Sequence, residues 1–349
     1  MKDRFKQIAK ITIFLGLSFV LLCFAFKNVQ IRDIFNELKT ARYSWLILSV
    51  AFSMLAFFSR ARRWVLMIRP LGYRPSTLNA YHAMMTGYLV NFALPRLGEV
   101  SKCVVLGKKE KIPADKLVGT VIVERTFDLI SMFVILLIML FLRGDLMGSF
   151  LKEEVISPIR EKLVSIFGFS ALFITSVIIL ILLLIFAAYQ FREELMRNRF
   201  VARLARFLKG IVNGLSSFYS MENKFEFIFH TIFIWVNYIL MSWVVVFMIP
   251  ATAHLTFADA TFILVIGSLG MAAPVQGGIG AFHWIVSRGL YAVYNINLEE
   301  GLAYATIAHE SQLILVAILG TISFYFLLRN KISLSSVTAP LKDLNNGQK

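Results

Sequence analysis

The chain has 349 residues, of which 58% are hydrophobic and only 16% are charged, with a mean hydropathy of +0.72. Soluble domains average about 25% charged residues, and here the run 171–189 carries no charge at all, which disfavours a large soluble all-α core. The formal charge of +15 does not indicate nucleic-acid binding, because the basic residues lie beside the ends of apolar runs, as membrane topology requires.

Cysteines and histidines predict neither a disulfide nor a metal site. Cys23 and Cys103 lie far apart, one in the first apolar run and one in a polar-flanked helix, so no disulfide framework or metal spacing follows from them. The histidines are scattered and form no ligand motif; they are His82, His230, His254, His283 and His309. We therefore expect no metal ion and no cofactor.

The apolar runs predict an all-α polytopic membrane protein, because several of them reach the roughly 20 residues that cross a bilayer. The expected full spans lie at about 11–26, 44–59, 117–142, 166–189, 227–250 and 302–328. The first resembles a signal peptide, but it lacks a small-residue cleavage pattern and Lys27 follows it directly, so we expect an uncleaved span. Residues 1–330 then form one integral membrane domain, and 331–349 form a disordered cytoplasmic tail.

Two further apolar stretches, 75–112 and 257–301, are interrupted by Pro and Gly. Each predicts a re-entrant hairpin of two half-helices, whose non-helical tip is tolerated at membrane depth only when it is buried in protein or faces a wet cavity. With the N-terminus in the cytoplasm, this arrangement places most basic residues on the cytoplasmic side. We therefore expect a protein integral to a bacterial-type cytoplasmic (inner) membrane, with both termini in the cytoplasm.

The segment 190–225 alternates basic residues with apolar ones such as Phe200, Leu204 and Phe207 at near-helical spacing. A cytoplasmic amphipathic helix on the anionic inner leaflet fits this pattern. A solvated linker helix is the alternative.

The two interrupted regions also predict an inverted repeat, with units 75–142 and 257–328. Aligning Leu117 with Leu302 places Arg125 against Glu310 without gaps. Three full spans separate the hairpins, so the hairpins enter from opposite faces, as in many secondary transporters. The alternative is that Pro-Gly punctuation recurs by chance.

Each hairpin predicts an anion site, because the free N–H groups of its second half-helix begin just after the turn and carry partial positive charge. In the first hairpin Arg96 and Lys102 add full charges, and in the second the glycines let a ligand approach the backbone. The alternative is that the glycines only permit tight packing and that Glu99 caps its own helix. The expected headgroup-binding residues are Arg63, Asn91, Pro95, Arg96, Gly98, Glu99, Lys102, Pro274, Gly277, Gly278, Gly280 and His283.

Ionisable residues within the spans usually mark function, because an unpaired charge there costs several kcal/mol. They are Glu124, Arg125, Asp128, His309 and Glu310. Structural pairing of Arg125 with Glu310 or Asp128 is the alternative to substrate contact. The basic residues from Arg60 to Arg63, with Trp64, are interpreted mainly as interfacial anchors, and a phosphate contact by one of them is the second interpretation.

Four motifs in this order resemble the membrane region of the lysylphosphatidylglycerol synthase family, often described as a flippase-like domain, from about residue 10 to 330. They are Arg60-Ala61-Arg62-Arg63-Trp64, Asn91 with Pro95-Arg96-Leu97-Gly98-Glu99, Glu124-Arg125 with Asp128, and Pro274 with Gly277-Gly278-Ile279-Gly280. The resemblance implies a membrane domain of the kind believed to move aminoacylated phosphatidylglycerol between leaflets. Other members of that family stand alone with no assigned role.

Two departures from the family pattern matter. The synthases carry a soluble transferase domain after the membrane region, and nothing folded is expected after residue 330 here, so lysyl transfer is not expected. Many relatives have an acid shortly after the Gly-rich turn, where this chain has His283, which leaves a proton role for that hairpin open.

We therefore predict a flippase or transporter of an anionic phospholipid or its derivative, with membrane lipids as partners and homo-oligomerisation left open. No nucleotide-binding loop is present, so energy would come from a gradient or from trapping. One alternative is an intramembrane enzyme of lipid-phosphate metabolism, with Glu99, Glu124 or His309 as general acid or base. Another is a non-catalytic partner of a lipid-modifying enzyme.

Overall fold

The computed structural model describes residues 30–93, 97–144, 221–273 and 275–329, with scattered positions from 16 to 26 and from 148 to 157. Within these ranges every regular element is a helix. The expected span 166–189, half of the span 11–26, most of the basic segment 190–225 and the tail 331–349 lie outside the described residues. So do Pro95, Arg96 and Pro274 at the two turns.

Four helices in the described ranges are long and apolar enough to cross a membrane, at the positions of four expected spans. They are α3 (Ser44–Ile68), α6 (Ala114–Leu142), α12 (Lys224–Val246) and α15 (Leu298–Arg329). Helix α3 runs beyond the expected end at residue 59. Its arginines do not end the apolar segment, because two of them turn inward onto carboxylates of α6.

Each interrupted region forms two short helices that pack against each other. The first pair is α4 (Thr77–Ala93) and α5 (Gly98–Glu110), and the second is α13 (Phe257–Ala272) and α14 (Ala281–Tyr294). The second pair is joined through a 3₁₀ turn, η4 (Gln276–Gly278), in which Gly277 and Gly278 have positive φ. A capping box between Thr256 and Asp259 starts α13.

The helix α2 (Ile31–Thr40) was not expected from the sequence and packs against α15. Two short 3₁₀ turns, η1 (Arg69–Leu71) and η3 (Pro250–Thr252), follow α3 and α12. Each begins with or contains a proline near its start, where a missing N–H does no harm.

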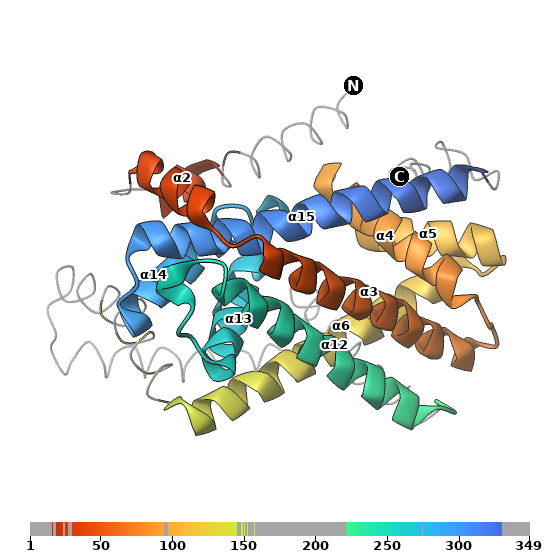
Figure 1. Cartoon of the computed structure of the whole chain (residues 1–349). Coiled ribbons are helices and arrows are strands. Elements are labelled where there is room, and N and C mark those ends of the chain that lie inside the picture. The colour runs from red at the N-terminus through yellow and green to blue at the C-terminus, as the bar shows by residue number, and fades with distance from the viewer. Residues whose placement is uncertain are drawn as a thin grey trace, which may run out of the picture.

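Helix α15 crosses the long dimension of the molecule and joins its two halves (Figure 1). Its first half packs against α14, where Gly301 lies against Ser287, and its second half packs against α4, where Gly320 lies against Leu89. The buried apolar residues form two clusters accordingly, one around α13 and α14 and one around α3, α4 and α5. Each helix pair therefore belongs to a core of its own.

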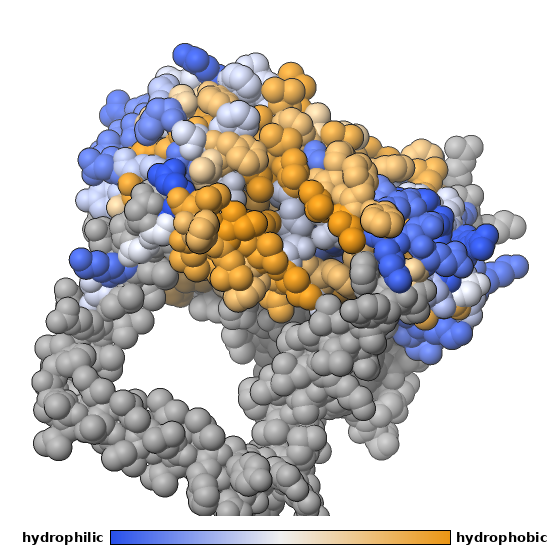
Figure 2. Space-filling model, turned by 90° about the horizontal axis from the view of Figure 1, so that it is seen from below, coloured by the Kyte–Doolittle hydropathy of each residue, from blue (hydrophilic) through white to orange (hydrophobic). Residues whose placement is uncertain are grey.

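Large apolar side chains are exposed along the four long helices, among them Phe58, Phe133, Ile232 and Ile314. In Figure 2 an apolar area lies between two hydrophilic ends of the molecule. An exposed apolar area of this kind marks a surface that contacts something other than water. With the four long helices, it identifies a helical membrane protein.

We expect Gly98→Ala to destabilise the first helix pair. A Cβ at Gly98 would lie 2.1 Å from the carbonyl oxygen of Gly87 and 2.5 Å from Cγ of Asn91, so α4 and α5 would have to separate. Overpacking of this kind costs about 1–3 kcal/mol and should lower the unfolding temperature of the detergent-solubilised protein. Gly119→Ala is the matched control, because a Cβ there meets nothing within 4 Å; an equal loss in both variants would contradict the packing argument.

Candidate functional site

Seven ionisable side chains from α3, α5 and α6 form one network, called here the charged cluster. Its members are Arg60, Arg63, Glu99, Lys102, Glu124, Arg125 and Asp128. Helix α3 supplies two arginines one helical turn apart, and α6 supplies Glu124 and Asp128 at i and i+4. That spacing places both side chains of each helix on the same face.

Glu124 is the centre of the charged cluster, and its side chain is only 1% exposed. One carboxylate oxygen accepts a hydrogen bond from Lys102 Nζ at 2.6 Å, and the other accepts from Arg60 Nη2 at 2.6 Å. Burial of a carboxylate is tolerated when its charge is paired and its oxygens accept hydrogen bonds. The three elements α3, α5 and α6 therefore meet at this one side chain.

Asp128 extends the cluster toward α3. It accepts hydrogen bonds from Arg63, whose side chain is fully buried, and from Arg60 at 3.2 Å. Arg60 also donates to the hydroxyl of Tyr238 on α12 at 3.0 Å. The guanidinium groups of α3 thus hold α6 and α12 around one polar centre.

Two of the candidate headgroup residues, Glu99 and Lys102, lie in the first turns of α5. Glu99 pairs with Lys102 at 2.9 Å and with Arg125 at 2.7 Å. Lys102 also lies over the ring of Trp64, 4.9 Å from its centroid, a favourable contact between a cation and an aromatic face. The indole N–H of Trp64 donates to Thr120 on α6.

The structure corrects three interpretations of the charged residues. Arg60 and Arg63 are not interfacial anchors, because both turn into the protein to meet carboxylates; Arg62 is only partly buried, and it pairs with Glu226 at 2.6 Å. Arg125 pairs most closely with Glu99 and, more distantly, with Glu124 at 3.6 Å and Asp128 at 3.8 Å; the expected alternative of an Asp128 pair is confirmed, and that of a Glu310 pair is wrong. Glu99 does not cap α5, because the start of this helix has no side-chain cap hydrogen bond and the Glu99 carboxylate forms ion pairs instead.

The backbone at the start of α5 is already partly occupied. The N–H of Gly98 donates to Oδ1 of Asn91 at 2.7 Å, which ties the end of α4 to the start of α5 across the turn. Asn91 therefore takes one of the free N–H groups that the sequence assigns to an anion. Tight packing accounts for Gly98 itself, as the close approach to Gly87 requires.

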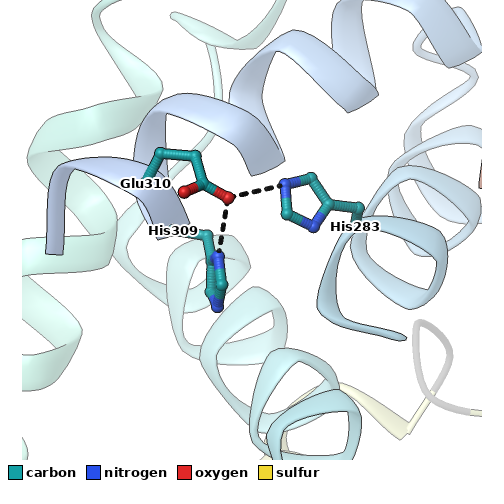
Figure 3. A group of neighbouring side chains, drawn as sticks. All are labelled: His283, His309 and Glu310. Atoms are coloured by element: carbon teal, nitrogen blue, oxygen red, sulfur yellow. Dashed lines mark hydrogen bonds and ion pairs between the residues drawn. The ribbon is translucent and has the colours of Figure 1, made fainter. Parts of the chain in front are cut away.

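A second group of candidate residues meets next to the Gly-rich turn η4, and is called here the histidine cluster: His283, His309 and Glu310 (Figure 3). His283 lies in the first turn of α14, while the other two are neighbours on α15. One oxygen of Glu310 lies 3.2 Å from Nδ1 of His309 and 3.6 Å from Nε2 of His283. The carbonyl of Gly277 accepts from Nε2 of His309 at 2.7 Å.

The other glycines of this turn have local roles. Gly278 and Gly280 have φ of +76° and +85°, values that favour glycine. A Cβ at Gly278 would lie 2.4 Å from Sδ of Met271, so this position also needs a small residue for packing. Helix α4 contacts η4, which brings the two interrupted regions into contact.

Sequence reasoning missed two parts of this arrangement. The sequence did not identify Arg60 or Tyr238 as part of the site around Glu124 and Asp128. These residues come from α3, α12 and α6, and no shared motif connects the three helices. Sequence reasoning also gave His283 and His309 no common site, since 25 residues separate them. The i,i+4 spacing of Glu124 and Asp128 was the available signal that a basic helix face must oppose them.

A family model described as the lysylphosphatidylglycerol synthase TM region matches residues 7–320. The chain belongs to this family. The family's name refers to a transmembrane region of enzymes that synthesise an aminoacylated phospholipid. The four long apolar helices agree with a transmembrane region.

A relative outside the named synthases also matches. The "UPF0104 membrane protein MJ1595" of Methanocaldococcus jannaschii is 28% identical over 125 residues, which cover 35% of this chain and 37% of the relative. The match therefore spans about a third of that relative's length.

We expect Glu124→Gln to destabilise this family member strongly. The change leaves Lys102 and Arg60 buried without their shared negative partner, and breaking a buried ion pair from one side costs about 3–5 kcal/mol. Thermal unfolding in detergent measures the loss.

The matched control is Glu226→Gln, because the Arg62–Glu226 pair is 29% and 31% exposed and exposed pairs contribute about 1 kcal/mol or less. Equal shifts of the unfolding temperature in the two variants would refute a central role for Glu124.

Proposed function

We propose that this protein moves an anionic phospholipid, or a derivative of one, between the leaflets of a bacterial-type cytoplasmic membrane. The observation that carries the proposal is the excess of positive charge in the charged cluster. Its basic members are Arg60, Arg63, Lys102 and Arg125, against three carboxylates. An anion at this cluster would neutralise the remaining positive charge.

Hydrogen-bonding capacity supports the same proposal. Among the described residues, Nε and Nη1 of Arg63 and Nε of Arg60 are buried without a hydrogen-bond partner. A buried donor without an acceptor costs about 1–3 kcal/mol, and phosphate oxygens are strong acceptors that guanidinium groups bind well. A lipid phosphate is therefore a suitable ligand for these donors.

The place of Arg125 suggests how such a ligand would arrive. Its side chain is 45% exposed, whereas Glu124 beside it is buried. Arg125 thus lies at the edge of the charged cluster, where it could meet a headgroup while the acyl chains stay in the bilayer. A polar path lowers the cost of carrying the charged headgroup through hydrocarbon.

We also propose that the two helix pairs are re-entrant and form an inverted repeat. Each short helix has 13 to 17 residues, or about 20–26 Å at 1.5 Å per residue, which is less than the roughly 30 Å of hydrocarbon. In each half the second short helix supplies a side chain to the polar cluster of the next long helix: Lys102 to α6, and His283 to α15. This shared order supports a repeat, and the distribution of basic residues supports both termini in the cytoplasm.

The test is leaflet exchange of fluorescent lipids in vesicles that contain the purified protein. We expect exchange of anionic phospholipids above that in protein-free vesicles, with slower exchange of phosphatidylcholine. Arg125→Ala should lower the anionic rate at least tenfold, because it removes the exposed charge of the cluster. Arg96→Ala should act in the same direction, on the sequence argument alone.

Arg62→Ala is the matched control, since Arg62 lies on the same helix as Arg60 and Arg63 but pairs outside the cluster. It should leave exchange unchanged. Absence of exchange for every anionic lipid would reject the proposal, and chemical turnover of the lipid without exchange would favour the intramembrane enzyme instead.

A further inference from the structure

We infer that His283, His309 and Glu310 bind a divalent transition-metal ion of the zinc class. These residues each offer one ligand atom, and the three atoms lie within 4.8 Å of one another. Two imidazoles and a carboxylate are a set that zinc and related ions use in proteins. The inference does not depend on lipid movement, because it concerns the second half of the molecule and a different ligand.

Two of the three separations between ligand atoms are already close to those around one ion, and all three lie within 4.8 Å. Bonds of about 2.0–2.1 Å in a tetrahedral site place neighbouring ligand atoms roughly 3.3 Å apart. The oxygen of Glu310 lies 3.2 Å from Nδ1 of His309 and 3.6 Å from Nε2 of His283. Small side-chain adjustments would therefore suffice to bring the three atoms around an ion.

The hydrogen bonds of His309 require a cation between its ring and Glu310. The carbonyl of Gly277 can only accept, so Nε2 of His309 carries the hydrogen of that 2.7 Å contact. Nδ1 then presents a lone pair to Glu310, whose carboxylate also only accepts. Two acceptors at 3.2 Å repel each other unless a proton or a metal ion lies between them.

His283 favours the metal ion over the proton. Its side chain is 3% exposed, and its Nε2 is 3.6 Å from Glu310, which is too long for a hydrogen bond. A single proton shared by His309 and Glu310 would leave Nε2 of His283 outside hydrogen-bond distance of Glu310, whereas a metal ion would accept a lone pair from that atom as well.

The surroundings suit a metal ligand set. The Gly277 carbonyl fixes the tautomer and orientation of His309, as backbone carbonyls commonly do for metal-bound histidines. Phe282 stacks on His309 with ring centroids 5.1 Å apart and so covers one side of the site. Glu310 is 41% exposed, so the site is not closed on its side.

The site would also leave room for a further ligand. Three protein atoms with an open fourth position are the pattern of zinc sites that bind water or substrate, whereas structural sites have four protein ligands. A bound ion would join α14 to α15 and, through His309, to the Gly-rich turn η4. Metal binding should therefore stabilise the second helix pair.

The test is metal binding by the full chain, purified in detergent with a tag that contains no histidine and stripped with a chelator. Equilibrium dialysis against Zn²⁺ should give about one ion per chain. Co²⁺ should give visible absorption bands of a four- or five-coordinate site. Zn²⁺ should also raise the unfolding temperature, because it binds only the folded state.

His283→Ala, His309→Ala and Glu310→Gln should each weaken Zn²⁺ binding at least tenfold and remove the Co²⁺ bands. Glu310→Gln retains the size of the side chain, so it reports on binding even if a histidine variant fails to fold. His254→Ala is the matched control, because His254 is exposed and lies outside the cluster. Unchanged binding in Glu310→Gln, or no Zn²⁺ binding by the unmodified chain, would overturn the inference.

Discussion

The first half of the structure depends on one buried carboxylate. Glu124 accepts hydrogen bonds from Lys102 on α5 and from Arg60 on α3, and so joins three helices at a depth where an unpaired charge is costly. Arg60 reaches on to Tyr238 of α12. The polar contacts that unite this half are therefore also the ones that any anionic ligand would meet.

This constraint explains why a helix as polar as the end of α3 lies inside the protein. Burying Arg63 is tolerable because Asp128 faces it, and burying Lys102 is tolerable because Glu124 and the ring of Trp64 face it. The basic residues exceed the acidic ones, which leaves donors without acceptors in the cluster. An anionic ligand, as proposed above, would supply acceptors to these donors.

The second half also buries ionisable side chains between helices, but these side chains are of different types. Here the polar centre consists of two imidazoles and one carboxylate, held between α14 and α15 beside a turn with left-handed glycines. Helix α15 belongs to both halves, since it packs on α14 at its start and on α4 near its end. Packing against α15 therefore joins the two halves.

The sequence by itself determined the membrane class, the four long described helices and the two interrupted pairs, because hydropathy and Pro-Gly interruption are local properties of the chain. It also selected most members of both clusters, since ionisable residues stand out within apolar runs. Only the tertiary structure decided that Arg60 and Arg63 turn inward, that Arg125 pairs with Glu99, and that His283 meets His309. Those outcomes depend on which helix faces lie opposite each other, and contacts between residues far apart in the chain leave no periodic pattern in either segment.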